Sequence, residues 1–257
     1  MTTTFINGSS LQMSPRSIAR MGGFFWLITF VMGALALSIY DGFVVAGDAA
    51  ATASNLLSRE PLYRLGVGAN LVATMAYLAA TLFVYELLRP VSRRISLLAA
   101  FFSLTACAIS CVAHALQLAP LVILRGESYA ALFTREQIDG LARLFLQTSE
   151  QTASVAFAFF GLHVFLIGVL ILRSTFLHRA VGLLMLFGGL GWLTFAFANL
   201  LSPAFGRTLS PYILFPGILG EGALVVWLLV KGVNTDRWME QTAAVQEAVG
   251  ARVPELP

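Results

Sequence analysis

Long apolar stretches separated by polar connections dominate the pattern of this chain. Each stretch holds about 20 residues or more, which is the length that an α-helix needs to cross the hydrocarbon core of a bilayer. The pattern predicts an all-α, polytopic membrane protein with six transmembrane helices in a bundle. The predicted spans are residues 21–40, 65–88, 95–124, 152–172, 180–201 and 211–232.

Two of the longer connections carry helical signals of their own, so we expect short amphipathic helices in the outer loops. Asp48 is the expected N-cap of a short helix that stops at Glu60, because Pro61 disfavours helical geometry in the residue before it. Residues 134–137 form a capping-box pattern, and apolar residues follow at helical spacing. No proline separates this second helix from the fourth span, so the two can be continuous.

The remaining segments are polar. We expect residues 1–15 to be a disordered N-terminal tail, residues 16–233 to form the transmembrane domain, and residues 234–257 to form a cytoplasmic tail with Trp238 at the interface. Residues 202–210 are expected to be a loop. Because residues 34–36 resemble a cleavage site, the first span has a signal peptide as its alternative; its length and aromatic residues favour a retained helix.

Composition agrees with this membrane assignment and argues against a nucleic-acid-binding protein. Of the 257 residues, 58% are hydrophobic and 11% are charged, whereas a soluble domain carries charge on about a quarter of its residues. Many of the basic residues behind the net charge of +3 lie at predicted helix ends, where they act as topology signals. The lipid bilayer is the expected partner, and the oligomeric state is left open.

Arg and Lys are divided unevenly between the two sides of the predicted membrane. The side that holds the short turns and both termini is richer in them, so the positive-inside rule makes it cytoplasmic. Aromatic residues at the outer ends support this orientation: Tyr40, Tyr63, Tyr129 and Tyr212. The basic residues on the cytoplasmic side are Arg16, Arg20, Arg89, Arg93, Arg94, Arg173, Arg179, Lys231, Arg237 and Arg252.

Glu221 is a carboxylate near the middle of the last span. A charge there costs about 2.5–3.5 kcal/mol, so it is usually buried in the bundle. Counting at 1.5 Å per residue places Glu221 and His163 at one height, about 15 Å into the membrane. If the fourth and sixth helices are neighbours, the two can pair to carry a proton or bind a ligand; the alternative is a polar clasp between helices. Gly217 and Gly220 allow close helix approach beside Glu221.

A second polar group is predicted at about 27–33 Å and could line a small cavity open to the outside; interfacial contacts with headgroups and water are the alternative. Its members are Asn70, His114, Gln117 and Asn199. Cys107, Cys111 and His114 share a helix face, but Cys in apolar helices more often packs than binds metal. A haem ligated by both His114 and His163 is not expected, because the two residues differ in predicted height by about 13 Å, whereas axial ligands lie on either side of one plane. No metal or cofactor is expected.

Four stretches, residues 47–71, 121–146, 161–186 and 211–234, resemble a family of bacterial multi-pass proteins grouped as domain of unknown function 4386. The ending is the most specific match, with Glu221 followed by Trp227-Leu-Leu-Val-Lys-Gly. The resemblance implies a protein of the bacterial cytoplasmic (inner) membrane with no established activity. In this family a Trp is often seen near the position of His163 and an Asn near that of His114, so both histidines depart from the pattern.

Three functional hypotheses follow, and none specifies a ligand. The first is a non-enzymatic membrane protein that binds or passes a small molecule or a proton through a polar site around Glu221. The second is a structural or partner-binding membrane protein, in which these groups hold helices together. A membrane-embedded enzyme ranks last because no nucleophile, base and electrophile converge, so no catalytic residue is assigned.

The orientation is tested by placing a cysteine at Arg135, in a predicted outer connection. We expect Arg135→Cys to react with a membrane-impermeant maleimide added to intact cells, because positive-inside topology puts that connection outside. The unchanged protein, whose Cys107 and Cys111 lie in an apolar run, is the control. Labelling only after the cells are opened would reverse the predicted orientation.

Overall fold

The computed structural model describes residues 13–126 and 131–250 and folds them into helices joined by short connections. Six helices are long and apolar enough to cross a membrane, which confirms the predicted all-α bundle. They are α1 (Pro15–Tyr40), α3 (Glu60–Leu88), α4 (Arg93–Arg125), α6 (Arg135–Arg173), α7 (Arg179–Leu201) and α8 (Pro203–Val230). Two shorter helices are α2 (Ala49–Ser58) and α9 (Thr235–Gly250). Most of the predicted N-terminal tail, Tyr129 and Arg252 lie outside the described residues.

Local sequence signals set several helix starts. Asp48 caps α2 as predicted, its side chain accepting a hydrogen bond from the Ala51 amide at 2.8 Å. Thr134 and Gln137 form both bonds of the predicted capping box at the start of α6. The amphipathic helix and the fourth span are continuous, since α6 runs unbroken for 39 residues.

Two predicted boundaries are wrong, and proline explains both. Helix α2 ends at Ser58, and Glu60 with Pro61 begins α3 instead of ending α2. Residues 203–210, expected as part of a loop, form the first turns of α8 behind Pro203. Proline is tolerated in the first turn of a helix because its missing N–H would have no intrahelical partner there. Here each proline starts a helix rather than breaking one.

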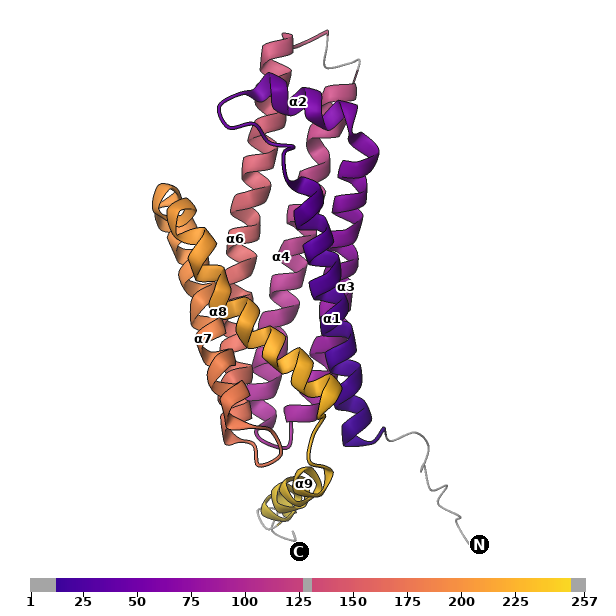
Figure 1. Cartoon of the computed structure of the whole chain (residues 1–257), viewed down its shortest axis with the longest axis vertical. Helices are drawn as coiled ribbons and strands as arrows, with labels where there is room; N and C mark the ends of the chain where they lie inside the picture. The colour runs from indigo at the N-terminus through magenta and orange to yellow at the C-terminus, as the bar shows by residue number, and fades with distance from the viewer. Residues whose placement is uncertain (1–12, 127–130, 251–257) are drawn as a thin grey trace, which may run out of the picture.

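The six long helices form a ring in chain order. Each packs on the next, from α1 on α3 through to α7 on α8, and α8 closes the ring by packing on α1. The start of α1 and helix α9 lie at one end, whereas α2 crosses the other, against α6 and α4 (Figure 1). Helices α7 and α8 tilt away from the other four towards the α2 end (Figure 1). Both described termini therefore share one end, and its cytoplasmic location stays a prediction.

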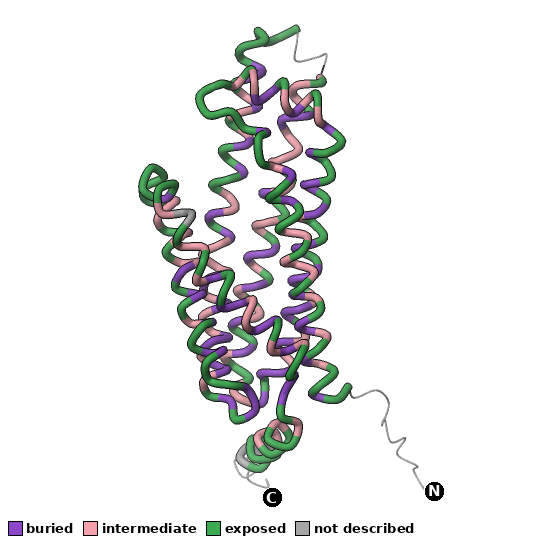
Figure 2. The backbone as a smooth tube through the Cα atoms, in the orientation of Figure 1, coloured by how far each residue is buried: buried purple, intermediate pink, exposed green. Residues whose placement is uncertain are grey.

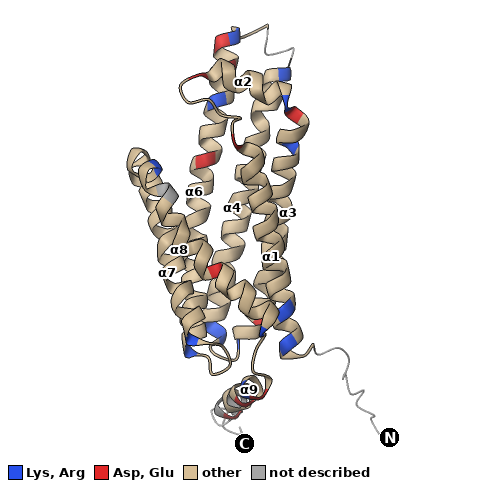
Figure 3. Cartoon of the chain, in the orientation of Figure 1, with Lys and Arg blue, Asp and Glu red and all other residues tan. Residues whose placement is uncertain are grey.

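The surface of the bundle is apolar along its length. Leu37 and Val31 of α1 are 76% and 52% exposed, as expected for side chains that face lipid rather than water. Buried positions line the inward side of the long helices (Figure 2). Lys and Arg gather near the two ends of the bundle, and Asp and Glu are sparse along its middle (Figure 3). This distribution fits a bilayer around the middle of the bundle.

Polar contacts link helices at both ends of the bundle. At the α2 end, the buried Glu60 carboxylate forms salt bridges with Arg64 and Arg125, so the start of α3 is tied to the end of α4. At the other end, Trp238 of α9 donates its indole N–H to the Leu87 carbonyl at 2.9 Å. The partly buried Trp238 therefore packs on the bundle itself.

Glycines permit the closest helix contacts. A Cβ on Gly189 of α7 would lie 2.5 Å from the Phe165 backbone nitrogen of α6. A Cβ on Gly220 of α8 would lie 2.5 Å from the Leu184 carbonyl oxygen of α7. The predicted close approach at Gly220 is confirmed, and it brings the backbones of α7 and α8 together.

Gly220→Ala tests this contact, and Gly222→Ala, two residues further along the same helix, is its control. We expect Gly220→Ala to destabilise the protein by about 1–3 kcal/mol, because the added methyl group meets backbone. Among the described residues, a Cβ on Gly222 meets no atom within 4 Å, so its variant should match or exceed the parent in stability. Thermal unfolding in detergent, followed by circular dichroism, measures both. Equal melting temperatures for the two variants would contradict the packing argument.

Candidate functional site

Glu221 is held by two tryptophans from two other helices. It is 7% exposed. Trp26 of α1 donates its indole N–H to Oε2 at 2.9 Å, and Trp192 of α7 donates to Oε1 at 2.6 Å. We call these three residues the Glu221 clasp. It joins α1, α7 and α8 at the contact that closes the ring, and gives each oxygen of the carboxylate a donor.

A glycine makes room for one arm of the clasp. A Cβ on Gly217, one turn before Glu221, would lie 2.5 Å from Cε2 of the Trp192 indole. The same indole stacks on Phe157 of α6, with ring centroids 5.0 Å apart and planes at 12°. The predicted close approach at Gly217 is therefore confirmed, and it admits a side chain that reaches Glu221.

His163 and Glu221 do not bond to each other, so the pairing considered from the sequence is not formed. Helix α7 stands between α6 and α8 in the ring. The two residues are linked through Trp26, which bonds Glu221 and whose ring centroid lies 6.2 Å from that of His163. Tyr77 of α3 completes the cluster, with centroids 5.2 Å from Trp26 and 5.6 Å from His163.

The bonding of His163 fixes its tautomer. Its Nδ1 lies 2.8 Å from the Ala99 carbonyl oxygen of α4. A carbonyl oxygen only accepts, so Nδ1 carries the proton and Nε2 of the neutral ring is a bare acceptor. Among the described residues, neither His163 Nε2 nor the Tyr77 hydroxyl has a hydrogen-bond partner, although both are buried. Leaving each unpaired costs about 1–3 kcal/mol, which points to a site for something small and polar.

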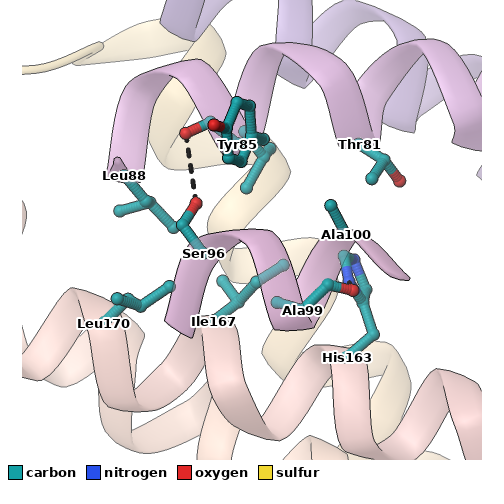
Figure 4. Close-up of a pocket in the computed structure, with 10 residues that line it drawn as sticks. Thr81, Tyr85, Leu88, Ser96, Ala99, Ala100, His163, Ile167 and Leu170 are labelled. Carbon is teal, nitrogen blue, oxygen red and sulfur yellow. Dashed lines mark hydrogen bonds between the residues drawn. The ribbon is translucent and has the colours of Figure 1, made fainter. Parts of the chain in front are cut away.

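A cavity of about 10 Å³ lies beside His163, which is room for about one water molecule. Its lining includes His163, Ala99, Ile167 and Ser96 (Figure 4). Ser96 lies in the first turn of α4, which begins at the end of the bundle that holds the termini (Figure 1). Ser96 donates its hydroxyl to the Tyr85 carbonyl at 3.1 Å there (Figure 4). The cavity is thus mostly apolar, with His163, Thr81 and Ser96 among its polar lining residues.

Three of the four outer polar residues share one network. The Asn70 amide donates to the Tyr40 hydroxyl at 3.5 Å, and that hydroxyl donates to Gln117 at 3.3 Å. Thr74 bonds the Asn70 carbonyl at 3.0 Å and His114 Nε2 at 3.1 Å. The network joins α1, α3 and α4.

Asn199, the fourth residue, lies apart. Its amide donates to the Phe195 carbonyl on its own helix at 2.8 Å, and it packs against Gly206 near the α7–α8 connection. That these outer residues line a cavity stays a prediction.

Polar side chains continue along the interface between α3 and α4. The hydroxyls of Thr81 and Ser103 form a hydrogen bond of 2.7 Å. On α3, Thr81 lies one turn after Tyr77 and two turns after Thr74. On each helix these residues recur every three, four or seven positions, so they share a face. The faces hold Tyr63, Asn70, Thr74, Tyr77 and Thr81 on α3, and Ser96, Ser103, Cys107, His114 and Gln117 on α4.

Sequence reasoning missed Trp26, Tyr77 and Trp192. A signal was available for the first two, because counting from Arg16 and Arg89 puts them at about 15–18 Å, near the height of Glu221. The same count from Arg179 puts Trp192 at about 20 Å, but the sequence does not show that its helix is a neighbour of α8. Cys107 is buried and Cys111 is exposed, so they do not converge. Among residues 13–126 and 131–250, no group of three or more His, Cys, Asp or Glu could hold a metal ion.

Most of this chain matches a known protein family. A family model described as Domain of unknown function (DUF4386) matches residues 21–232. The chain belongs to this family. The match to DUF4386 includes the Glu221 clasp, Tyr77 and His163. An "Uncharacterized protein" of Archaeoglobus fulgidus is 26% identical over 179 residues, covering 69% of this chain and 89% of the relative. No solved structure matches the chain with significance.

A double-mutant cycle tests the clasp. We expect Trp26→Phe and Glu221→Gln each to lower the free energy of unfolding by about 1–3 kcal/mol, since each leaves a buried polar group unpaired. The double variant should lose less than the sum, with a coupling of about 1–2 kcal/mol. Thermal unfolding in detergent measures all four proteins.

Trp227→Phe provides the matched control for the cycle. Trp227 lies on the same helix as Glu221 and is not one of its two donors. Its effect should therefore add to that of Glu221→Gln. A coupling of zero between Trp26 and Glu221 would show that the bond between these two residues contributes no stability.

Proposed function

We propose that this protein binds and relays protons inside the membrane, at a site formed by His163 and Tyr77 beside the Glu221 clasp. The bare, buried Nε2 of His163 carries the proposal, because Ala99 holds the opposite nitrogen and aims the free lone pair. Imidazole gains and loses a proton near neutral pH in water, which makes it the commonest proton shuttle among side chains. An ionisable group within a membrane bundle is a functional candidate by default.

The residues around His163 favour binding of a proton at its imidazole. Tyr77 has an unpartnered hydroxyl in the adjacent ring, and Trp26 connects the pair to the Glu221 carboxylate. A positive charge on the imidazole would then have a negative group in the same cluster, which lowers the cost of burying it. The neighbouring cavity of about 10 Å³ fits water, so we propose a proton rather than a larger molecule as the species handled.

Polar groups lead away from the site in both directions. Towards the α2 end lie the bonded pair of Thr74 and His114 and then the Asn70–Tyr40–Gln117 chain. Towards the opposite end lies the cavity that reaches Ser96. Hydroxyl groups can both donate and accept, so each can hand on a proton. This arrangement supports a relay along the inside of α3 and α4.

The clasp itself favours a second candidate, a structural or partner-binding membrane protein without transport. Both oxygens of Glu221 already have donors, which suits a fixed link between helices more than a group that changes partners. In that case Glu221, Asn70, His114 and Gln117 would serve only helix association.

We also propose that the protein lies in the bacterial cytoplasmic membrane, with both termini in the cytoplasm. The excess of Arg and Lys at the end that holds both termini supports this orientation. Residues 16–233 would form the transmembrane domain, flanked by an N-terminal tail over 1–15 and a C-terminal tail over 234–257 that includes α9.

Proton flux into liposomes tests the relay. We expect the purified protein to acidify the lumen under a valinomycin-clamped potassium gradient, read by an internal pH-sensitive dye. His163→Gln should reduce this flux by about a hundredfold, the usual contribution of a positioned proton-transfer group. Thr194→Val, which alters an exposed hydroxyl bonded within α7, is the control and should keep the parent flux.

Two results would reject the relay. The first is a parent flux no greater than that of empty liposomes, and the second is unchanged flux in His163→Gln. Loss of thermal stability in Glu221→Gln, with no flux in any variant, would leave the structural candidate.

A further inference from the structure

A lipid-facing groove runs along α7 and α8 on the surface of the bundle. It encloses about 720 Å³, a volume within the range of small-molecule sites. Its walls are apolar for most of their length, with Val181 and Leu184 on α7 and Ile218 and Val226 on α8. The proton site proposed above is not part of this groove, because neither His163 nor Tyr77 lines the groove.

The groove is polar and basic at one end. Lys231 follows the last turn of α8, and His178 caps the start of α7. Trp227 lies between wall and rim, its ring centroid 5.3 Å from that of His178. Among the described residues that line the groove, none is acidic. The start of α7 adds the positive end of its helix dipole there.

The length of the groove matches one leaflet. From Ile218 to Lys231 the helix rises by about 20 Å, and one leaflet with its headgroup region is about 20–22 Å thick. The basic end lies near the end of the bundle that holds the termini, where headgroups would sit. One lipid molecule can therefore place an acyl chain in the groove and its phosphate at the basic end.

Small residues keep the groove open. A Cβ on Gly222 meets no described atom within 4 Å, and two further small residues, Ala180 and Ala223, also line the groove. Gly220 differs, since its missing side chain admits α7. Gly220 therefore serves contact between helices, whereas Gly222 faces the open groove.

We propose that this groove binds one glycerophospholipid with an anionic headgroup, from the leaflet at the end of the bundle that holds the termini. The acyl chain lies along the apolar walls, and the phosphate is met by Lys231 and His178. Basic pockets between transmembrane helices recognise anionic lipid headgroups in this way. A zwitterionic lipid gains less, because its own cation adds a positive charge beside Lys231. The proposal does not depend on the proton relay.

Quenching of tryptophan fluorescence by brominated lipids tests the groove. The full chain is reconstituted in phosphatidylcholine with increasing fractions of phosphatidylglycerol brominated on its acyl chains, and with brominated phosphatidylcholine as the comparison. Trp227→Phe identifies the share of the signal that comes from the groove. We expect Trp227 to be quenched at a lower fraction of brominated phosphatidylglycerol than of brominated phosphatidylcholine.

Two variants separate the acyl and headgroup contacts. Lys231→Gln should reduce the preference for phosphatidylglycerol by about fivefold, the effect of one basic residue near a membrane surface. Gly222→Leu should fill the groove and abolish the selective quenching. Gly68→Leu is its control, because Gly68 on α3 is exposed and, like Gly222, has open space around its Cβ among the described residues.

Equal quenching by the two lipids in the parent protein would overturn the proposal, since the groove would then hold only bulk lipid. Unchanged preference in Lys231→Gln would do the same. If Gly222→Leu fails to fold by circular dichroism, Lys231→Gln decides alone, because it alters an exposed residue at the groove's rim.

Discussion

The carboxylate of Glu221, bonded to two indole N–H groups, is the interaction on which the closure of the bundle depends. In lipid, apolar contact between helices gains little over contact with acyl chains, so packing and interhelical hydrogen bonds must hold helices together. Glu221 supplies such bonds at the contact of α8 with α1, which is otherwise one of the smaller interfaces of the ring. Breaking either bond would leave a buried polar group with nothing to replace it.

Glycine makes the clasp and its surroundings possible. Gly217 admits the Trp192 indole, Gly220 admits the backbone of α7, and Gly222 leaves an open groove on the lipid side. Within six residues of one helix, the absence of a Cβ therefore has three different consequences. The stretch that carries the strongest family resemblance combines them with the one carboxylate near the middle of that span.

The polar groups of the interior fall into two kinds. Those of the clasp are fully paired, which suits a fixed structural link. His163 Nε2 and the Tyr77 hydroxyl are buried and have no partner among the described residues, a costly state for which a bound water, a bound ion or a catalytic role is a common explanation. Our proposed relay rests on this contrast: Glu221 holds the helices in place, and His163, on the other side of Trp26, handles the proton.

The sequence by itself determined the six spans, the N-cap at Asp48, the capping box of α6 and the family, because the period and length of apolar runs and the local caps are properties of short segments. It also identified Glu221, and grouped Asn70, His114 and Gln117 by their height. Only the tertiary structure decided which helices are neighbours: α7 separates His163 from Glu221, gives Glu221 its second donor in Trp192 and removes Asn199 from the outer network. Counting residues along a helix gives height in the membrane, whereas partners depend on the rotation and order of the helices, which the sequence of one span does not contain.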